Sequence, residues 1–176
     1  MIHFVDTKEE FDRVINGEFM EYVRQLEREG KIRHIGMSTH NPETAMMAAK
    51  HGEIEMLLFS INPAFDMMPP VTDLEEYFAE TYDEKLSGIA PEREELYKLC
   101  EQNRVGITVM KGYGGGRLFH AQTSPFGVAL TPVQCLHYAL TRPAVASVMV
   151  GYDTTEHVDA AVAYENASEE QKDYAS

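Results

Sequence analysis

Residues 106–119 read GITVMKGYGGGRLF, a short apolar segment that ends in a lysine and continues into four glycines within five positions. A continuous apolar segment is typical of a strand buried on both faces of a parallel sheet. Glycines directly after such a strand permit positive φ angles and let backbone N–H groups approach anionic oxygens closely. The pattern indicates either a phosphate-binding loop or a flexible turn, and the glycines alone do not distinguish the two.

Four other apolar segments also have the character of buried strands, and amphipathic helical patterns lie between them. The predicted strands are 2–5, 32–37, 55–61, 106–110 and 145–150. Asn41-Pro42 opens one helix that Gly52 closes, and Thr131-Pro132 opens another. This alternation predicts an α/β fold of about five parallel βα units with right-handed crossovers, in one domain spanning residues 1–176.

The connection formed by residues 62–91 is much longer than the others. Its acidic, aromatic and proline-rich composition predicts a long loop insertion at the carboxyl end of a strand.

Composition excludes several classes of partner. The net charge of −14 argues against nucleic acid and against an anionic membrane surface, because both need a basic face. No apolar segment is long enough to span a membrane, and the N-terminus lacks a basic signal-peptide head. Cys100 and Cys135 are predicted to be reduced core thiols, which favours a cytoplasmic protein; a disulfide or a catalytic thiol is the alternative.

The chemistry of barrel-type sheets lies where the strands end. At these points the sequence places His3, Ser38-Thr39-His40, Asn62, Lys111 with the glycines, and Gly151-Tyr152-Asp153. Together with their flanking segments they resemble the aldo/keto reductase family. The resemblance runs through IHFVD, EGKIRHIGMSTHNPE, LLFSINPAFD, GITVMKGYGGGRL and LTPVQCLHYALTRPAVASVMVGYDTTEHVDAA. It is closest to a bacterial branch that carries a cysteine-rich iron–sulfur tail after a DYA-like ending; this sequence ends at DYAS without such cysteines, so no iron–sulfur cluster is expected in it.

The resemblance implies a (β/α)₈ barrel that binds NAD or NADP and uses a catalytic Tyr, Asp, Lys and His. The chain resembles the family from its fourth strand onward, which implies a partial barrel. Only His3 matches the catalytic group. The chain is therefore expected to be an oxidoreductase fragment that carries much of the cofactor site, lacks the catalytic Tyr, Asp and Lys, and is inactive alone. The alternative is a non-catalytic nucleotide-binding or oligomerising α/β module.

Four residues match positions that face the nicotinamide or the substrate in the family. His3 matches the histidine that orients the substrate carbonyl, although a half-buried imidazole without that role is the alternative. Ser38 and Thr39 match the Ser and Asn that hold the nicotinamide carboxamide, and the threonine lacks the paired donor and acceptor of an amide. Asn62 matches an asparagine near the nicotinamide, but Asn62-Pro63 is also a plain turn initiator.

The remaining matches concern the phosphates and the adenosine. By resemblance the loop after residue 110 follows the pyrophosphate, and it comprises Lys111, Gly112, Gly114, Gly115, Gly116 and Arg117. Gly151 precedes the helix whose N-terminus holds the adenosine phosphate. Asp153 stands where the family often has a basic residue, which favours NAD(H) over NADP(H). A simple helix N-cap is the other interpretation of Asp153.

A partial barrel leaves strand edges unpaired around residues 2–5 and 145–150. The expected partner is a second copy of the chain or a separate N-terminal half. The seven histidines show no metal-ligand spacing, so no metal site is expected.

Overall fold

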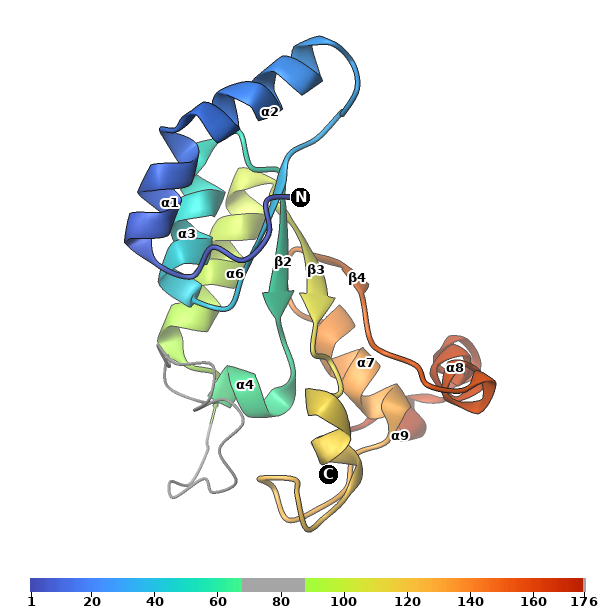
Figure 1. The fold of residues 1–176 in the computed structure, drawn as a ribbon. Helices are drawn as coiled ribbons and strands as arrows, with labels where there is room; N and C mark the ends of the chain where they lie inside the picture. The colour runs from blue at the N-terminus through green and yellow to red at the C-terminus, as the bar shows by residue number, and fades with distance from the viewer. Residues whose placement is uncertain (68–87, 176) are drawn as a thin grey trace.

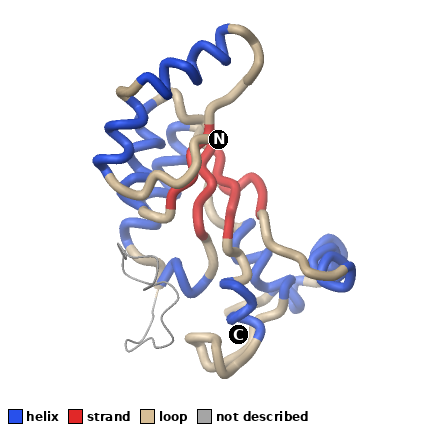
Figure 2. The backbone as a smooth tube through the Cα atoms, in the orientation of Figure 1, coloured by secondary structure: helices blue, strands red, loops and turns tan. Residues whose placement is uncertain are grey.

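The computed structural model describes residues 1–67 and 88–175. Within them four parallel strands form one sheet in the order β1-β2-β3-β4, each paired with its neighbour in sequence (Figure 2). The strands are β1 (Gly36–Thr39), β2 (Met56–Ser60), β3 (Gly106–Met110) and β4 (Val145–Val148). The parallel βα organisation is therefore as the sequence predicts.

Helices lie between and beyond these strands, and in Figure 1 the strands point down toward α4 and η1. The α-helices are α1 (Lys8–Ile15), α2 (Glu18–Arg28), α3 (Pro42–His51), α4 (Pro63–Met67), α6 (Pro91–Asn103), α7 (Pro132–Leu140), α8 (Thr155–Val162) and α9 (Glu169–Lys172). Two 3₁₀-helices are η1 (Gly114–Phe119) and η2 (Ala163–Asn166). Carboxyl ends of parallel strands share one edge of the sheet, so the loops that follow all four strands face the same end of the molecule.

The predicted strand at residues 2–5 is wrong, and in the part of the chain that the structure describes the sheet has four strands where the sequence predicts five. Ile2 makes an isolated parallel bridge to Met37, and the chain then turns. Phe4 has a φ of 62°, which no strand accommodates, and its N–H donates to Ser38 Oγ at 2.7 Å. The Ser38 side chain thus takes the N–H of Phe4, and the Ser38 carbonyl accepts from the N–H of Val5 at 3.0 Å.

One strand boundary differs from the prediction, and one helix was not predicted. The strand predicted at 32–37 begins only at Gly36, where the pairing with Met56 starts. Helix α1 was not predicted from the sequence, although its start carries a capping box. There Thr7 accepts from the N–H of Glu10, and Glu10 accepts from the N–H of Thr7.

The helix-terminus signals are confirmed where the sequence showed them. Asn41 caps α3 by accepting from the N–H groups of Glu43 and Thr44, and Gly52 closes that helix with a φ of 85°. Thr131 and Gln134 form a capping box at the start of α7. These short-range capping contacts join residues two or three positions apart, which explains why a single sequence shows them.

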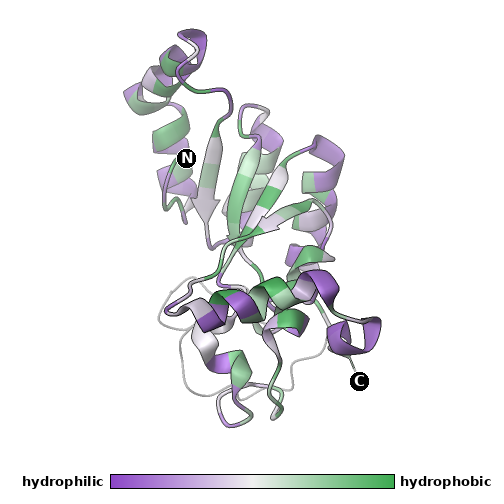
Figure 3. Cartoon of the chain, turned by 90° about the vertical axis from the view of Figure 1, so that its right-hand side faces the viewer, coloured by the Kyte–Doolittle hydropathy of each residue, from purple (hydrophilic) through white to green (hydrophobic). Residues whose placement is uncertain are grey.

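One face of the sheet is covered by α3 and α6, and this layer holds most of the core. The fully buried strand residues there are Met37, Leu57, Phe59, Ile107 and Val109. Hydrophobic residues accordingly concentrate on the strands, and polar ones on the outward helix surfaces (Figure 3). Cys100 and Cys135 are buried free thiols, as predicted, and burial raises the pKa of each to about 12.

A buried ionic network ties the carboxyl end of β2 to α6 and α7. The Asp66 carboxylate, on α4, accepts from Arg93 at 3.0 Å, from the Tyr97 hydroxyl, and from the Tyr138 hydroxyl at 2.8 Å. Arg93 also donates to the carbonyl of Ser60 at 2.9 Å. Burial raises the pKa of Asp66, whereas Arg93 and the two hydroxyls oppose that rise. The network fixes the start of the segment that follows β2.

Most of the predicted insertion at 62–91 lies outside the described residues. Its first described part, residues 63–67, is α4 rather than loop.

The β4 side of the sheet is far less covered than the β1–β3 side. Ala146 and Ser147 are exposed, and Met149 directly after the strand is 59% exposed. The hydroxyl of Thr108 contacts that of Ser147 at 2.9 Å, and a register irregularity separates these strands near Ile107. Helix α8 lies beyond this margin with only Ala161 buried.

Candidate functional site

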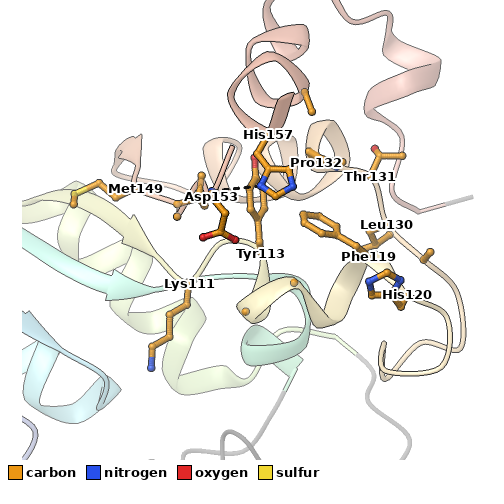
Figure 4. Close-up of a pocket in the computed structure, with 16 residues that line it drawn as sticks. Lys111, Tyr113, Phe119, His120, Leu130, Thr131, Pro132, Met149, Asp153 and His157 are labelled. Atoms are coloured by element: carbon orange, nitrogen blue, oxygen red, sulfur yellow. Dashed lines mark hydrogen bonds between the residues drawn. The ribbon is translucent and has the colours of Figure 1, made fainter. Parts of the chain in front are cut away.

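A cavity of about 920 Å³ opens between the loop after β3, the loop after β4 and the starts of α7 and α8 (Figure 4). This volume lies within the range of small-molecule sites. The lining residues are Lys111, Tyr113, Gly115, Gly116, Phe119, His120, Ala129, Leu130, Thr131, Pro132, Met149, Val150, Gly151, Asp153, His157 and Ala160. The cavity thus gathers the glycine segment and the residues that follow β4, which lie 33 or more positions apart in the chain.

The glycine segment forms a tight helical turn whose backbone only glycine adopts easily. Gly115 and Gly116 have φ angles of 65° and 85°, and a Cβ at either position would meet nothing within 4 Å. Space therefore remains open above this backbone. The N–H groups of Gly114 and Gly116 donate to the carbonyls of Lys111 and Tyr113, so these two amides serve the turn itself.

Gly112 has a different role. A Cβ there would lie 3.1 Å from Val150 and 3.2 Å from Val148, so the glycine allows the chain after β4 to pass close by. This close approach brings Gly151 and Asp153 to the same cavity as the glycine turn.

One wall of the cavity is aromatic and apolar. The rings of Tyr113 and Phe119 lie 4.9 Å apart, and behind them Leu118, Leu130 and Cys135 form a small buried cluster. Burial raises the pKa of Tyr113, with a further contribution from the neighbouring Tyr152 hydroxyl. This phenol stays protonated near neutral pH, and the wall presents a flat, mostly uncharged surface.

The opposite wall is formed by the start of α8. Thr154 caps the helix by accepting from the N–H of His157, and His157 Nδ1 lies 3.4 Å from the backbone nitrogen of Asp153. Figure 4 shows the Asp153 carboxylate directed toward the side of the cavity that carries Tyr113. A carboxylate and an imidazole at a helix N-terminus thus supply the polar groups of this wall.

Lys111 lines the cavity with its backbone but directs its ammonium group away from it (Figure 4). Its φ is 58°, an unusual value for a residue with a side chain, and its carbonyl accepts from the Asn62 amide at 2.9 Å. Burial lowers the pKa of Lys111, and the negative charge of Asp6 partly opposes this.

The predicted nicotinamide-facing residues form internal hydrogen bonds. Ser38 accepts from the N–H of Phe4, and Thr39 donates to Asp6 at 3.0 Å. The amide of Asn62 donates to Lys111 and accepts from the N–H of Phe65 at 2.9 Å. All three side chains are at least 97% buried.

The predicted site residues thus fall into two groups. Five of them line the cavity: Lys111, Gly115, Gly116, Gly151 and Asp153. Seven do not: His3, Ser38, Thr39, Asn62, Gly112, Gly114 and Arg117. His3 is exposed, and its ring lies 6.1 Å from that of Phe4.

Several cavity residues were missed by the sequence reasoning. The most informative are His157, Tyr113 and Phe119. His157 had a usable signal, because it is the third residue after the Thr154 cap and so faces the helix entrance. The aromatic pair had none, since its orientation depends on the turn at Gly115 and Gly116.

No group of three or more His, Cys, Asp or Glu side chains in residues 1–67 and 88–175 is placed to hold a metal ion. No helix in this part of the chain is long and apolar enough to cross a membrane.

Comparison with known proteins identifies the class. The aldo/keto reductase family model matches residues 1–130, and the chain belongs to that family. No curated protein matches the chain.

Solved structures show the same fold. The holo form of the aldo-keto reductase AKR11C1 from Bacillus halodurans is 19% identical with a TM-score of 0.62, and 88% of this chain covers 53% of that one. Its apo form is 21% identical with a TM-score of 0.58, and the match covers 88% of this chain and 54% of that one. The thermostable aldo-keto reductase Tm1743 in complex with the inhibitor epalrestat is 19% identical with a TM-score of 0.51. This match covers 88% of this chain and 52% of that one. The chain therefore spans about half the length of these reductases, and its four-stranded sheet is a partial barrel, as predicted.

Proposed function

We propose that this chain is the cofactor-binding part of a nicotinamide-dependent aldo/keto reductase-type oxidoreductase, corresponding to the family barrel from its fourth strand onward. The observation that carries the proposal is the 920 Å³ cavity between the glycine turn and the start of α8. Aldo/keto reductases as a family use a nicotinamide dinucleotide, and this cavity combines an aromatic wall with a helix N-terminus, which suits a nucleotide and its phosphates.

The residues present fit such a cofactor. Open space above Gly115 and Gly116 leaves room for phosphate oxygens against bare backbone. Tyr113 and Phe119 offer ring faces to the adenosine part, and the N-terminus of α8 favours negative charge. The cofactor would supply a hydride, and this chain would contribute binding and orientation.

Asp153 favours NAD(H) over NADP(H) in this proposal. A carboxylate repels a 2′-phosphate and accepts a hydrogen bond from a free ribose hydroxyl. Calorimetric titration should therefore show weak binding of NADH, near millimolar or about −4 kcal/mol, and weaker binding of NADPH. Asp153→Arg should reverse this order. Tighter binding of NADPH by the unmutated chain would contradict the assignment of Asp153.

A second candidate is a nucleotide-binding module without nicotinamide chemistry. It is favoured by the internal hydrogen bonds of Ser38, Thr39 and Asn62, which occupy the groups expected to hold the nicotinamide. Titration with ADP distinguishes the candidates. Equal affinity for ADP and NADH would mean that the nicotinamide end contributes nothing, whereas the reductase assignment requires NADH to bind more tightly.

The chain alone is expected not to reduce carbonyl compounds. The resemblance identifies no tyrosine here as the family's proton donor, and a positioned acid is worth about 10²–10⁴ in rate. Absorbance at 340 nm with NADH and a panel of aldehydes and ketones should show no enzyme-dependent change. Adding a separate N-terminal half that bears the Tyr, Asp and Lys should produce turnover. Robust reduction by the chain alone would overturn this expectation.

Assembly is proposed on the basis of the two sheet margins. Among residues 1–67 and 88–175, strand β4 has a neighbour only in β3, and Met149 beyond it is 59% exposed. At the other margin Ile2 makes a single bridge to Met37. Such edges favour pairing with a second copy or with an N-terminal half. Sedimentation should detect a dimer or larger species, and a stable monomer at micromolar concentration would count against pairing between copies. A cytoplasmic location and kinship with the iron–sulfur branch are further parts of the proposal, supported by two buried free thiols and by the sequence motifs.

A further inference from the structure

A second, smaller pocket lies at the opposite end of the sheet from the 920 Å³ cavity. It has a volume of about 290 Å³ and is lined by residues from the C-terminal ends of α3 and α6 and from the segments that lead into β2 and β3. The two helices lie side by side and end near the upper end of the sheet in Figure 1. Because the chemistry of parallel βα folds takes place at the carboxyl ends of the strands, this α3–α6 pocket is separate from the proposed reaction.

Two positively charged residues line the α3–α6 pocket. Lys50 lies in the last turn of α3, and Arg104 directly follows α6. Neither side chain has a hydrogen bond or an ion pair within residues 1–67 and 88–175, whereas Arg93 and Lys98 on α6 both have one. Both side chains have long stems, so their charged ends can reach across a pocket of this size. Two positive charges are therefore available to a ligand.

Arg104 has an unusual backbone conformation for a residue with a side chain. Its φ is 59°, in the left-handed region where the residue that ends a helix is usually glycine. Gly52 occupies the matching position at the end of α3, with a φ of 85°. A cation near a helix C-terminus offsets the helix dipole, but Lys50 does so from an ordinary helical position. Arginine at this strained position supplies the pocket with a guanidinium that the usual glycine would lack.

The α3–α6 pocket also carries negative charge. Glu55 lines it; one carboxylate oxygen lies 2.8 Å from His34 Nδ1, and the other has no hydrogen bond within the described residues. Asn103 Nδ2 donates to the Ala49 carbonyl at 3.0 Å and joins the two helix ends, whose carbonyl groups carry negative partial charge. A ligand of one sign would therefore meet groups that repel it, whereas a ligand with both signs would find a partner for each.

Three further lining residues are apolar. Ala49, Ile54 and Val105 are at most 4% exposed. The volume of about 290 Å³ lies at the lower end of the range for small-molecule sites, so the ligand has to be small. These residues favour a short apolar group beside the charged ones.

We propose that the α3–α6 pocket binds a small apolar α-amino acid. The Arg104 guanidinium and the Lys50 ammonium hold its carboxylate, Glu55 holds its ammonium, and the apolar residues contact its side chain. Arg104 is the principal anchor, because a planar guanidinium makes two parallel hydrogen bonds to a carboxylate. The site goes beyond the proposed function, since none of its lining residues lines the larger cavity.

The test is an NMR titration of the full chain with L-leucine and with two analogues of one charge each. Isocaproate is leucine without its ammonium, and isoamylamine is leucine without its carboxylate. Leucine at millimolar concentration should shift the amides of Gly52, Ile54 and Val105 saturably. Each analogue should bind at least about tenfold more weakly, as expected for loss of a charge-assisted hydrogen bond. No saturable shift with leucine, or an analogue that binds as tightly as leucine, would overturn the proposal.

Arg104→Gly gives α6 the residue type that closes α3. Glycine favours this backbone angle, so the variant should fold while its leucine affinity falls about tenfold. Lys50→Met keeps a similar stem and should bind leucine several-fold more weakly. The matched control Arg13→Gln, at an exposed arginine on α1, should change nothing. Unchanged leucine affinity in Arg104→Gly would refute the site.

A parallel NADH titration separates this inference from the proposed function. Shifts at Gly115 and Gly116 with NADH test the proposed function alone, and Arg104→Gly should leave them as they are in the unmutated chain. Leucine-dependent shifts at Gly115 and Gly116, with none at Gly52 and Val105, would refute the amino-acid site.

Discussion

The β1–β3 side of the sheet and its β4 side are built from similar strands but differ in how they are covered. Leu57 and Ile107 are fully buried under α3 and α6, whereas Met149 at the β4 margin is 59% exposed. The cavity lies against the exposed margin and not against the packed layer. The difference indicates that stability is concentrated in β1–β3 and that ligand binding depends on the less covered side.

Removing the buried cation of the Asp66 network should have the largest effect. Arg93→Met leaves a carboxylate buried without its charge partner, and breaking such a pair costs about 3–5 kcal/mol. Urea unfolding should register this loss. Lys98→Met on the same helix removes an exposed ion pair with Glu94 and should cost at most about 1 kcal/mol. Similar losses for both variants would refute a stability role specific to the buried network.

Truncation of apolar side chains compares the two margins directly. Leu57→Ala should lower the free energy of unfolding by about 2–5 kcal/mol, because it removes a fully buried side chain and leaves a cavity. Met149→Ala should stay within about 0.5 kcal/mol, as is usual for an exposed position. Chemical unfolding of both variants measures the difference. A large loss in Met149→Ala would mean that the β4 margin is covered in solution, for example by a second copy.

The smallest effect concerns the acid dependence of stability. The pKa of Asp6 in the fold lies below its usual value of 3.8, so its stabilisation is complete above that value and is lost as the pH falls through the lower, folded-state pKa. Asp6→Asn should therefore be destabilised near neutral pH but lose less further stability below pH 3.8 than the unmutated chain. Unfolding free energies measured across this range check it, with the exposed Asp159→Asn as control. A pH profile unchanged by Asp6→Asn would contradict it.

Sequence reasoning succeeded where short-range chemistry decides the structure. The ends of α3 were predicted from Asn41-Pro42 and Gly52, and the start of α7 from Thr131-Pro132, because each of these signals acts within a few residues. It failed at residues 2–5, where the positive φ of Phe4 is stabilised by Ser38, 34 positions away. Apolar composition predicts a strand there, and only the tertiary contact ends it.

In the candidate site too, features with a local sequence signal were predicted, and features that depend on distant segments were not. Glycines at 115 and 116 were predicted because a positive φ favours that residue type, and they do line the cavity. The hydrogen bond from Asn62 to the carbonyl of Lys111 spans 49 positions, and the bond from Tyr138 to Asp66 spans 72. No local pattern in a single sequence encodes such contacts.

The central claim is that the β4 side of the sheet, and not the packed β1–β3 layer, binds a nicotinamide dinucleotide. Residue-by-residue NMR shifts on titration with NADH to millimolar concentration test it most directly. The account predicts saturable shifts at Gly115, Gly116, Gly151, Asp153 and His157, with the amides of β1 and β2 unchanged. Shifts confined to β1 and β2, or no saturable shift at any residue, would contradict it.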